Sequence, residues 1–211
     1  MSYFVKEIYY TLQGEGAQTG RPAVFCRFSG CNLWSGREED RHAAICSFCD
    51  TDFRGTDGPN GGVFLDASAL ARAITSQWPN FSLGRPYVVF TGGEPLLQLD
   101  TVLTKAMKEA GFDIAVETNG TRPLVAGIDW VCVSPKAGTE LLVVAGDELK
   151  LVFPQSEAPP EKFANLSFTH FYLQPMDGPE KAENEQLTLA YCLANPNWKM
   201  SNQTHKWLRI P

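Results

Sequence analysis

Residues 86–120 read PYVVFTGGEPLLQLDTVLTKAMKEAGFDIAVETNG. An apolar, β-branched run at 86–95 enters a Gly-Gly turn, and a helical segment capped by Asp100 ends at Gly111. A second apolar run, 112–120, follows at once. A strand, a helix and another strand in this order favour parallel strands joined by a crossover. The stretch therefore predicts an α/β fold.

Four further apolar runs extend this pattern on both sides, at 21–30, 128–136, 148–154 and 169–178. Apolar residues recur at helical spacing in 66–78 and 181–196. The segment KEIYYTLQGEG, residues 6–16, is an apolar and aromatic run that breaks into a Gly-punctuated loop, and we do not count it as a strand. We therefore expect one domain, residues 1–211, with six strands and three helices.

Polar side chains recur where five of these strands end. Ligands of parallel sheets and barrels gather beyond the carboxyl ends of the strands. A shared site is therefore expected at this edge. Its candidate groups are Arg27 and Ser29, Thr91 to Glu94, Glu117 to Asn119, Ser134 to Lys136, and Gln174 to Asp177.

Three of the six cysteines follow the spacing C-x14-C-x2-C, at Cys31, Cys46 and Cys49. Cysteines two residues apart can reach one metal centre from a tight loop, and three ligands leave one coordination position open. His42 is either a fourth ligand or a surface residue of the charged segment 32–45, which we expect to be a solvated flap or short helix. The other cysteines are expected to pack in the interior: Cys26, Cys132 and Cys192.

Composition narrows the class of protein. The chain has 211 residues, 44% of them apolar, and a net charge of −6, so no general basic field attracts nucleic acid. No run approaches the ~18 apolar residues that span a bilayer. The N-terminus lacks the pattern of a signal peptide, which predicts a cytoplasmic protein with reduced thiols and no membrane partner.

The cysteine triad, TGGEP, ETNG and SPK together resemble the radical S-adenosylmethionine (SAM) superfamily. The opening YYTLQGEG and the CDT that follows the last cysteine narrow the resemblance to the 7-carboxy-7-deazaguanine synthase family, over residues 12–211. Most superfamily members space their cysteines C-x3-C-x2-C. This chain departs from that pattern because position 35 is Ser35, so the second ligand has to be Cys46.

The resemblance implies an incomplete, modified TIM-like (β6/α3) barrel that carries three cofactors. A [4Fe–4S] cluster would sit on the three cysteines, SAM would chelate its fourth iron, and Thr51 would bind Mg²⁺. The alternative for Thr51 is a cap of the following turn, and for Glu94 a favourable interaction with the N-terminal dipole of the helix that follows it at Leu96. The resemblance assigns these residues to SAM: Phe48, Cys49, Asp50, Gly92, Gly93, Glu94, Glu117, Asn119, Ser134, Pro135, Lys136, Gln174, Pro175, Met176 and Asp177.

The resemblance also implies a reaction, the conversion of 6-carboxy-5,6,7,8-tetrahydropterin to 7-carboxy-7-deazaguanine with loss of ammonia. This is a carbon–nitrogen lyase step of 7-deazapurine and queuosine biosynthesis. An adenosyl radical abstracts the substrate hydrogen and SAM is regenerated, so no side chain is assigned to that step. The expected substrate contacts are Leu12, Gln13, Gly14, Glu15, Arg27, Thr91, His205 and the terminal carboxylate of Pro211.

Partners follow from the same resemblance: a small pterin, an electron donor such as a flavodoxin, and a second copy of the chain that covers the open barrel edges. Two other functions are weighed against it. One is a zinc-stabilised binding module without activity, with His42 as fourth ligand. The other is a radical SAM activase that acts on a protein partner.

Overall fold

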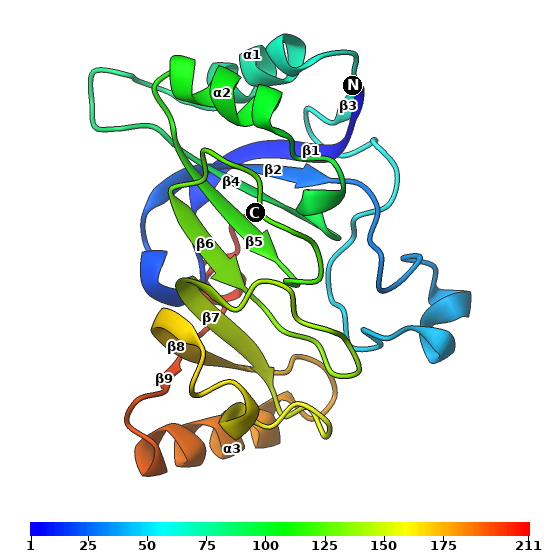
Figure 1. The fold of residues 1–211 in the computed structure, drawn as a ribbon, viewed down its shortest axis with the longest axis vertical. Helices are drawn as coiled ribbons and strands as arrows, with labels where there is room; N and C mark the ends of the chain where they lie inside the picture. The colour runs from blue at the N-terminus through cyan, green and yellow to red at the C-terminus, as the bar shows by residue number, and fades with distance from the viewer.

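A computed structural model describes residues 1–211 and contains one nine-stranded sheet that does not close into a ring (Figure 1). Its strand order is β3-β1-β2-β4-β5-β6-β7-β8-β9. The α/β class and the incomplete barrel expected from the sequence are confirmed. The six expected strands are consecutive and parallel, with the bounds β2 (Pro22–Phe28), β4 (Tyr87–Gly92), β5 (Asp113–Thr118), β6 (Trp130–Val133), β7 (Ala145–Phe153) and β8 (Ser167–Pro175).

The strand count of six was too low, because three strands lie at the edges of the sheet. β1 (Tyr3–Leu12) pairs antiparallel with β2 and with β3 (Gly62–Phe64), and β9 (Lys199–Met200) extends the sheet beyond β8. The register of β1 shifts between Val5 and Glu7. That irregularity and the adjacent charges interrupt the apolar alternation by which a strand is recognised.

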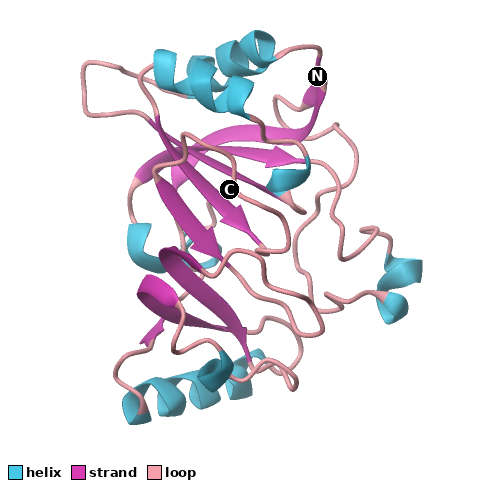
Figure 2. Ribbon diagram, in the orientation of Figure 1, coloured by secondary structure: helices cyan, strands magenta, loops and turns pink.

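The three expected helices are present, α1 (Ala67–Gln77), α2 (Thr101–Glu109) and α3 (Lys181–Ala194). Asp66 and Asp100 cap the first two by accepting a hydrogen bond from a backbone amide three residues on. Figure 2 shows α1 and α2 together near one end of the sheet and α3 near the other. The shorter helices are α4 (Thr204–Leu208) and the 3₁₀ turns η1 (Gly16–Gln18), η2 (Glu38–Ala43), η3 (Pro95–Leu97) and η4 (Pro160–Lys162).

Alternate residues of the parallel strands face opposite sides of the sheet. One side carries Val88, Phe90, Ile114 and Val116, which belong to a core cluster of 29 buried residues shared with the helices. The other side is polar toward the carboxyl ends of the strands, and these polar side chains form the site described below. None of the helices has the length and apolarity that a membrane crossing requires.

The cysteines expected to pack do so. Cys26 and Cys132 are buried within β2 and β6, and Cys192 is half-buried against the core. The charged segment between the first two motif cysteines forms η2, which agrees with the expected flap or short helix.

Candidate functional site

A cavity of about 420 Å³ opens at the carboxyl ends of the parallel strands. Its wall also includes the cysteine loop and the C-terminal segment. Every residue that the sequence suggested for the binding of cluster, SAM, Mg²⁺ or substrate lines this cavity, except Glu94 and Pro135, and the strand-end candidate Ser29 does not line it either. His42 is exposed and does not line it, so the cavity lacks the fourth ligand of the zinc alternative.

The three motif cysteines lie on two loops that face the cavity. Cys31 follows β2, whereas Cys46 and Cys49 follow η2. A hydrogen bond from the Cys46 thiol lowers the pKa of Cys49 to about 6, and the same bond together with burial raises that of Cys46. Cys49 is therefore poised to be a thiolate, the form that binds metal.

The three thiols are not arranged around a single metal ion. No group of three His, Cys, Asp or Glu side chains is arranged to hold one metal ion. A tetrahedral ion with metal–sulfur bonds near 2.3 Å requires sulfur atoms only about 3.8 Å apart. An iron–sulfur cluster accepts wider spacing, because each cysteine binds a different iron atom.

Two glycines let β4 turn directly against the loop that carries Cys31. Gly92 has φ of +151°, and a Cβ there would lie 2.4 Å from the carbonyl oxygen of Phe28. A Cβ on Gly93 would lie 2.4 Å from the oxygen of Gly30. Only glycine permits this approach, which joins the Gly-Gly turn to the first cysteine.

Glu94 lies behind the cavity wall and is fully buried. Its carboxylate accepts hydrogen bonds from the amides of Leu96 (2.9 Å) and Asn119 (2.8 Å) and from the hydroxyl of Thr118 (2.7 Å). Burial raises its pKa. Glu94 thus lies at the N-terminus of η3, where the alternative placed it, and in addition caps η3 and connects β4 to the end of β5.

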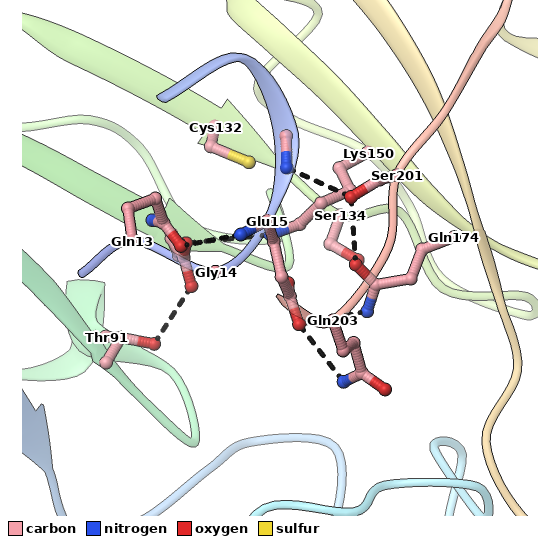
Figure 3. Close-up of polar contacts among 12 residues, drawn as sticks. Gln13, Gly14, Glu15, Thr91, Cys132, Ser134, Lys150, Gln174, Ser201 and Gln203 are labelled. Atoms are coloured by element: carbon pink, nitrogen blue, oxygen red, sulfur yellow. Dashed lines mark hydrogen bonds and ion pairs between the residues drawn. The ribbon is translucent and has the colours of Figure 1, made fainter. Parts of the chain in front are cut away.

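Glu15 is the centre of a buried polar network (Figure 3). One carboxylate oxygen is 2.5 Å from Nζ of Lys150, and the other accepts from the amides of Gln174 (3.2 Å) and Gln203 (3.0 Å). Burial opposes ionisation of Glu15, but the charge of Lys150 and these hydrogen bonds outweigh it and lower its pKa to about 2. Glu15 is therefore a carboxylate at neutral pH.

Glu117 at the end of β5 is the second carboxylate of the network. It accepts from the amide of Gln13 (2.9 Å), lies 3.6 Å from Nζ of Lys150 and meets the Thr91 hydroxyl at 3.5 Å. Lys150 is 5% exposed, so one buried ammonium serves two acidic side chains. The cavity floor can therefore accept hydrogen bonds from donors on a ligand.

Sequence reasoning missed Lys150 and Gln203. In β7, Leu149 and Leu151 face the core, whereas Glu148 and Lys150 point to the opposite side. This alternation of charged and apolar residues inside a strand was the available signal. No comparable signal in the sequence marked Gln203, because its hydrogen-bond partner Glu15 lies 188 residues away along the chain.

Replacing Lys150 with Met should destabilise the chain by about 3–5 kcal/mol, because a buried charge pair loses one partner. Urea unfolding at pH 7 measures the change. Lys105→Met is the matched control, since that side chain is 78% exposed and pairs with Glu109 only at 3.9 Å. We expect less than about 0.5 kcal/mol there. Equal effects of the two substitutions would contradict the account.

The pH dependence follows from the lowered pKa of Glu15. In the wild-type chain its ion pair contributes stability above pH of about 4.3, the ordinary pKa of a glutamate. This contribution is lost as the pH falls toward 2. In Lys150→Met the carboxylates take up protons at higher pH, so the variant should lose less stability than wild type between pH 4 and pH 2.

Arg27 offers only part of its guanidinium to the cavity. Nε donates to Glu7 at 2.8 Å and Nη2 donates to the Tyr9 hydroxyl at 3.0 Å. Nη1 makes no hydrogen bond within the chain and remains open to an anion. The two side chains of β1 therefore use two of the three guanidinium nitrogens, which leaves one for a ligand.

The C-terminal segment closes one wall of the cavity. The amide and hydroxyl of Thr204 both donate to the oxygen of Gly14 at 3.0 Å, and the Thr11 hydroxyl donates to the terminal oxygen of Pro211 at 3.1 Å. A Cβ on Gly14 would lie 2.3 Å from Nδ1 of His205, so a side chain at position 14 would displace His205. These contacts bring His205 and Pro211 to the cavity.

Lys206 links α4 to two other parts of the site. Its Nζ lies 2.9 Å from Asp50, beside Cys49, and 2.5 Å from Asp177, after β8. Lys206 therefore joins α4 to the cysteine loop and to the segment after β8.

Comparison with known proteins gives consistent relatives over the whole chain. The chain is 60% identical over 211 residues to 7-carboxy-7-deazaguanine synthase of Bordetella pertussis and 61% identical to that of Caulobacter vibrioides, with full coverage of all three chains. The crystal structure of QueE from Escherichia coli superposes with a TM-score of 0.68 at 28% identity, covering 96% of this chain and 94% of that one. No family model matches the sequence.

Proposed function

The chain belongs to the 7-carboxy-7-deazaguanine synthase family, whose members are radical SAM lyases of queuosine biosynthesis, and we propose that it converts 6-carboxy-5,6,7,8-tetrahydropterin to 7-carboxy-7-deazaguanine with loss of ammonia. One observation carries this proposal. A single cavity of about 420 Å³ is lined by the three motif cysteines and by the polar groups at the strand ends. The same cavity contains the unpaired Nη1 of Arg27 and the carboxylates of Glu15 and Glu117. That size suits small ligands.

The family implies SAM and an iron–sulfur cluster. We propose that Cys31, Cys46 and Cys49 hold a [4Fe–4S] cluster, whose reduction of SAM would supply the radical chemistry. The close contact between the Gly-Gly turn and the Cys31 loop supports SAM binding at this turn. The backbone groups of the two glycines then lie next to a cysteine that is proposed to bind the cluster. The remaining expected SAM contacts on the cavity wall stay proposals, as do Glu94 and Pro135 behind it.

The substrate contacts are proposed from charge and hydrogen-bonding capacity. The open Nη1 of Arg27 suits the substrate carboxylate. Glu15 and Glu117 suit the N–H donors of the guanine-like edge, because both are hydrogen-bond acceptors that face the cavity. The terminal carboxylate of Pro211 and the ring of His205 complete the proposed set.

Binding of a pterin carboxylate tests this function without turnover. The oxidised analogue 6-carboxypterin is titrated into anaerobic holoprotein with SAM and followed by its fluorescence. We expect saturable binding that is at least about tenfold tighter than that of pterin lacking the carboxylate, because a charge-assisted hydrogen bond contributes about 1.5–3 kcal/mol. Equal or absent binding of both compounds would favour the activase alternative.

Thr51 is proposed as the protein ligand of Mg²⁺. Its side-chain hydroxyl lines the cavity and makes no hydrogen bond within the chain, whereas a turn cap would use it. A single protein oxygen with substrate and water oxygens suits an ion that loses its waters reluctantly.

Thr51→Ala should therefore need about ten times more Mg²⁺ for half-maximal turnover. The measurement is a Mg²⁺ titration of initial rates, and Thr56→Ala, outside the cavity wall, serves as control. An unchanged requirement and rate would remove Thr51 from the metal site.

The partners are proposals of the same kind. An electron donor such as a flavodoxin would have to approach the cluster, and a homodimer would cover the unpaired sheet edges left by β3 and β9. A cytoplasmic location is consistent with six free cysteines.

A further inference from the structure

The long segment between the first two motif cysteines folds back onto the cysteine loop through one side chain, Arg41. Its Nη1 donates to the carbonyl oxygens of Ser47 (2.7 Å) and Cys49 (3.0 Å). Arg41 therefore forms hydrogen bonds to the backbone on both sides of Phe48, within the turn that contains Cys46 and Cys49.

Two further contacts fix the orientation of this guanidinium. Nε donates to both carboxylate oxygens of Glu38, at 2.7 and 2.9 Å. Cζ of the guanidinium lies over the ring of Trp34, 4.2 Å from the ring centre. A cation over an aromatic face is attracted by the ring quadrupole, and the carboxylate sets the rotation about that face.

The side chain of Trp34 is itself held in place by packing and by a hydrogen bond. It is 8% exposed, packs edge-on against Phe53 at 5.6 Å and donates its indole N–H to the carbonyl of Arg37 at 3.1 Å. The chain Phe53–Trp34–Arg41 thus connects the start of the excursion to the turn that carries its last two cysteines. A side chain held on this many sides differs from an ordinary surface arginine, which keeps rotamer freedom.

We propose that Arg41 is a positioning residue for the iron–sulfur cluster, and that the fourteen-residue spacing exists in part to deliver it. This inference rests on the proposed cluster. By binding two carbonyl oxygens, Arg41 holds the backbone of the C-x2-C turn in the conformation that presents both thiolates. It also sets a permanent positive charge beside them.

Two separable consequences follow from geometry and from charge. Without the hydrogen bonds from Arg41, the backbone of the C-x2-C turn is less constrained and the cluster should lose iron faster. Loss of a group that orients metal ligands costs about 10–100-fold in metal affinity or activity. Separately, a nearby cation stabilises the reduced cluster, which is more negative than the oxidised one. Removing that cation therefore lowers the reduction potential.

The experiment uses the full chain with its cluster, prepared without oxygen. Wild type is compared with Arg41→Gln, Arg41→Lys, Glu38→Gln and the control Arg37→Gln, whose side chain is 57% exposed and reaches only Glu39 at 3.6 Å. Three quantities are measured: iron and sulfide per chain, the rate of iron loss to a chelator, and the midpoint potential by electron paramagnetic resonance titration.

We expect Arg41→Gln to lose iron about 10–100 times faster than wild type and to have a lower midpoint potential. Arg41→Lys keeps the positive charge but loses the planar guanidinium that binds two carbonyl oxygens and Glu38 together. It should therefore lose iron faster than wild type at a nearly unchanged midpoint potential. Glu38→Gln should lose iron at an intermediate rate, because it loosens the orientation of Arg41, but its midpoint potential should not fall, because the positive charge stays and a paired negative charge is removed.

Iron loss and potential of Arg41→Gln that match those of Arg37→Gln would overturn the inference. Faster iron loss with an unchanged potential in Arg41→Gln would overturn its electrostatic part and keep the positioning part. A wild-type chain that holds no cluster would instead contradict the proposed function, so the two failures are distinguishable.

Discussion

Cys46→Ala should yield a folded protein that lacks a complete [4Fe–4S] cluster and shows no detectable turnover. Cys46 is 6% exposed in the cavity wall, and alanine fills most of its space, so folding should survive. With two thiolates left, two of the four irons have no protein ligand instead of the single iron left open for SAM, and the proposed radical chemistry stops at its first step. The expected loss is complete because no neighbouring side chain replaces the thiolate: His42 is exposed and Ser35 has a hydroxyl instead of a thiol.

Iron and sulfide analysis with an absorption spectrum, on protein prepared without oxygen, measures this result. Cys192→Ala is the matched control, since this cysteine is half-buried against the core and outside the cavity. It should keep the iron content and activity of wild type. A Cys46→Ala protein with four irons per chain would assign the second ligand elsewhere.

Removal of Ile210 and Pro211 should abolish measurable turnover, with at least about a 100-fold loss in kcat/KM. The Thr11 hydroxyl holds the Pro211 oxygen at 3.1 Å, which fixes the terminal carboxylate at the cavity. Removing two residues withdraws that charge by roughly 7 Å. Substrate donors that met it are then left unpaired, at about 1.5–3 kcal/mol each.

Addition of one alanine after Pro211 is the variant to compare with this truncation. It keeps the Pro211 carbonyl next to Thr11 but moves the negative charge one residue further. We expect it to raise KM for the pterin and to leave iron content unchanged. Trp207→Ala, at a 67% exposed position outside the cavity, should behave as wild type. Full activity of the truncated chain would show that the terminal carboxylate does not contact substrate.

The six parallel strands were predictable from sequence because each is rich in apolar residues, and β4 in particular is a continuous apolar run, as buried parallel strands are. Their polar ends were predictable as a site for the same topological reason, and the cavity gathers them. β1 was not recognised, because Lys6 and Glu7 coincide with a register shift. Charged residues at such an irregularity resemble a loop.

The contacts that the sequence could not reveal are those between distant segments. Lys150 meets Glu15 across 135 residues, and Lys206 meets Asp50 across 156. Neither pair has a fixed spacing that would mark it. Glu94 is a different case: its motif was recognised, but its hydrogen bonds to Thr118 and Asn119 form only when β4 and β5 lie side by side.

Turnover of the proposed substrate tests the central claim most directly. Anaerobic holoprotein is incubated with SAM, Mg²⁺, a reductant and 6-carboxy-5,6,7,8-tetrahydropterin, and the products are identified by mass spectrometry. The account predicts 7-carboxy-7-deazaguanine and ammonia in equal amounts, with SAM not consumed in proportion to product. Cleavage of SAM to 5′-deoxyadenosine with the pterin unchanged would contradict it.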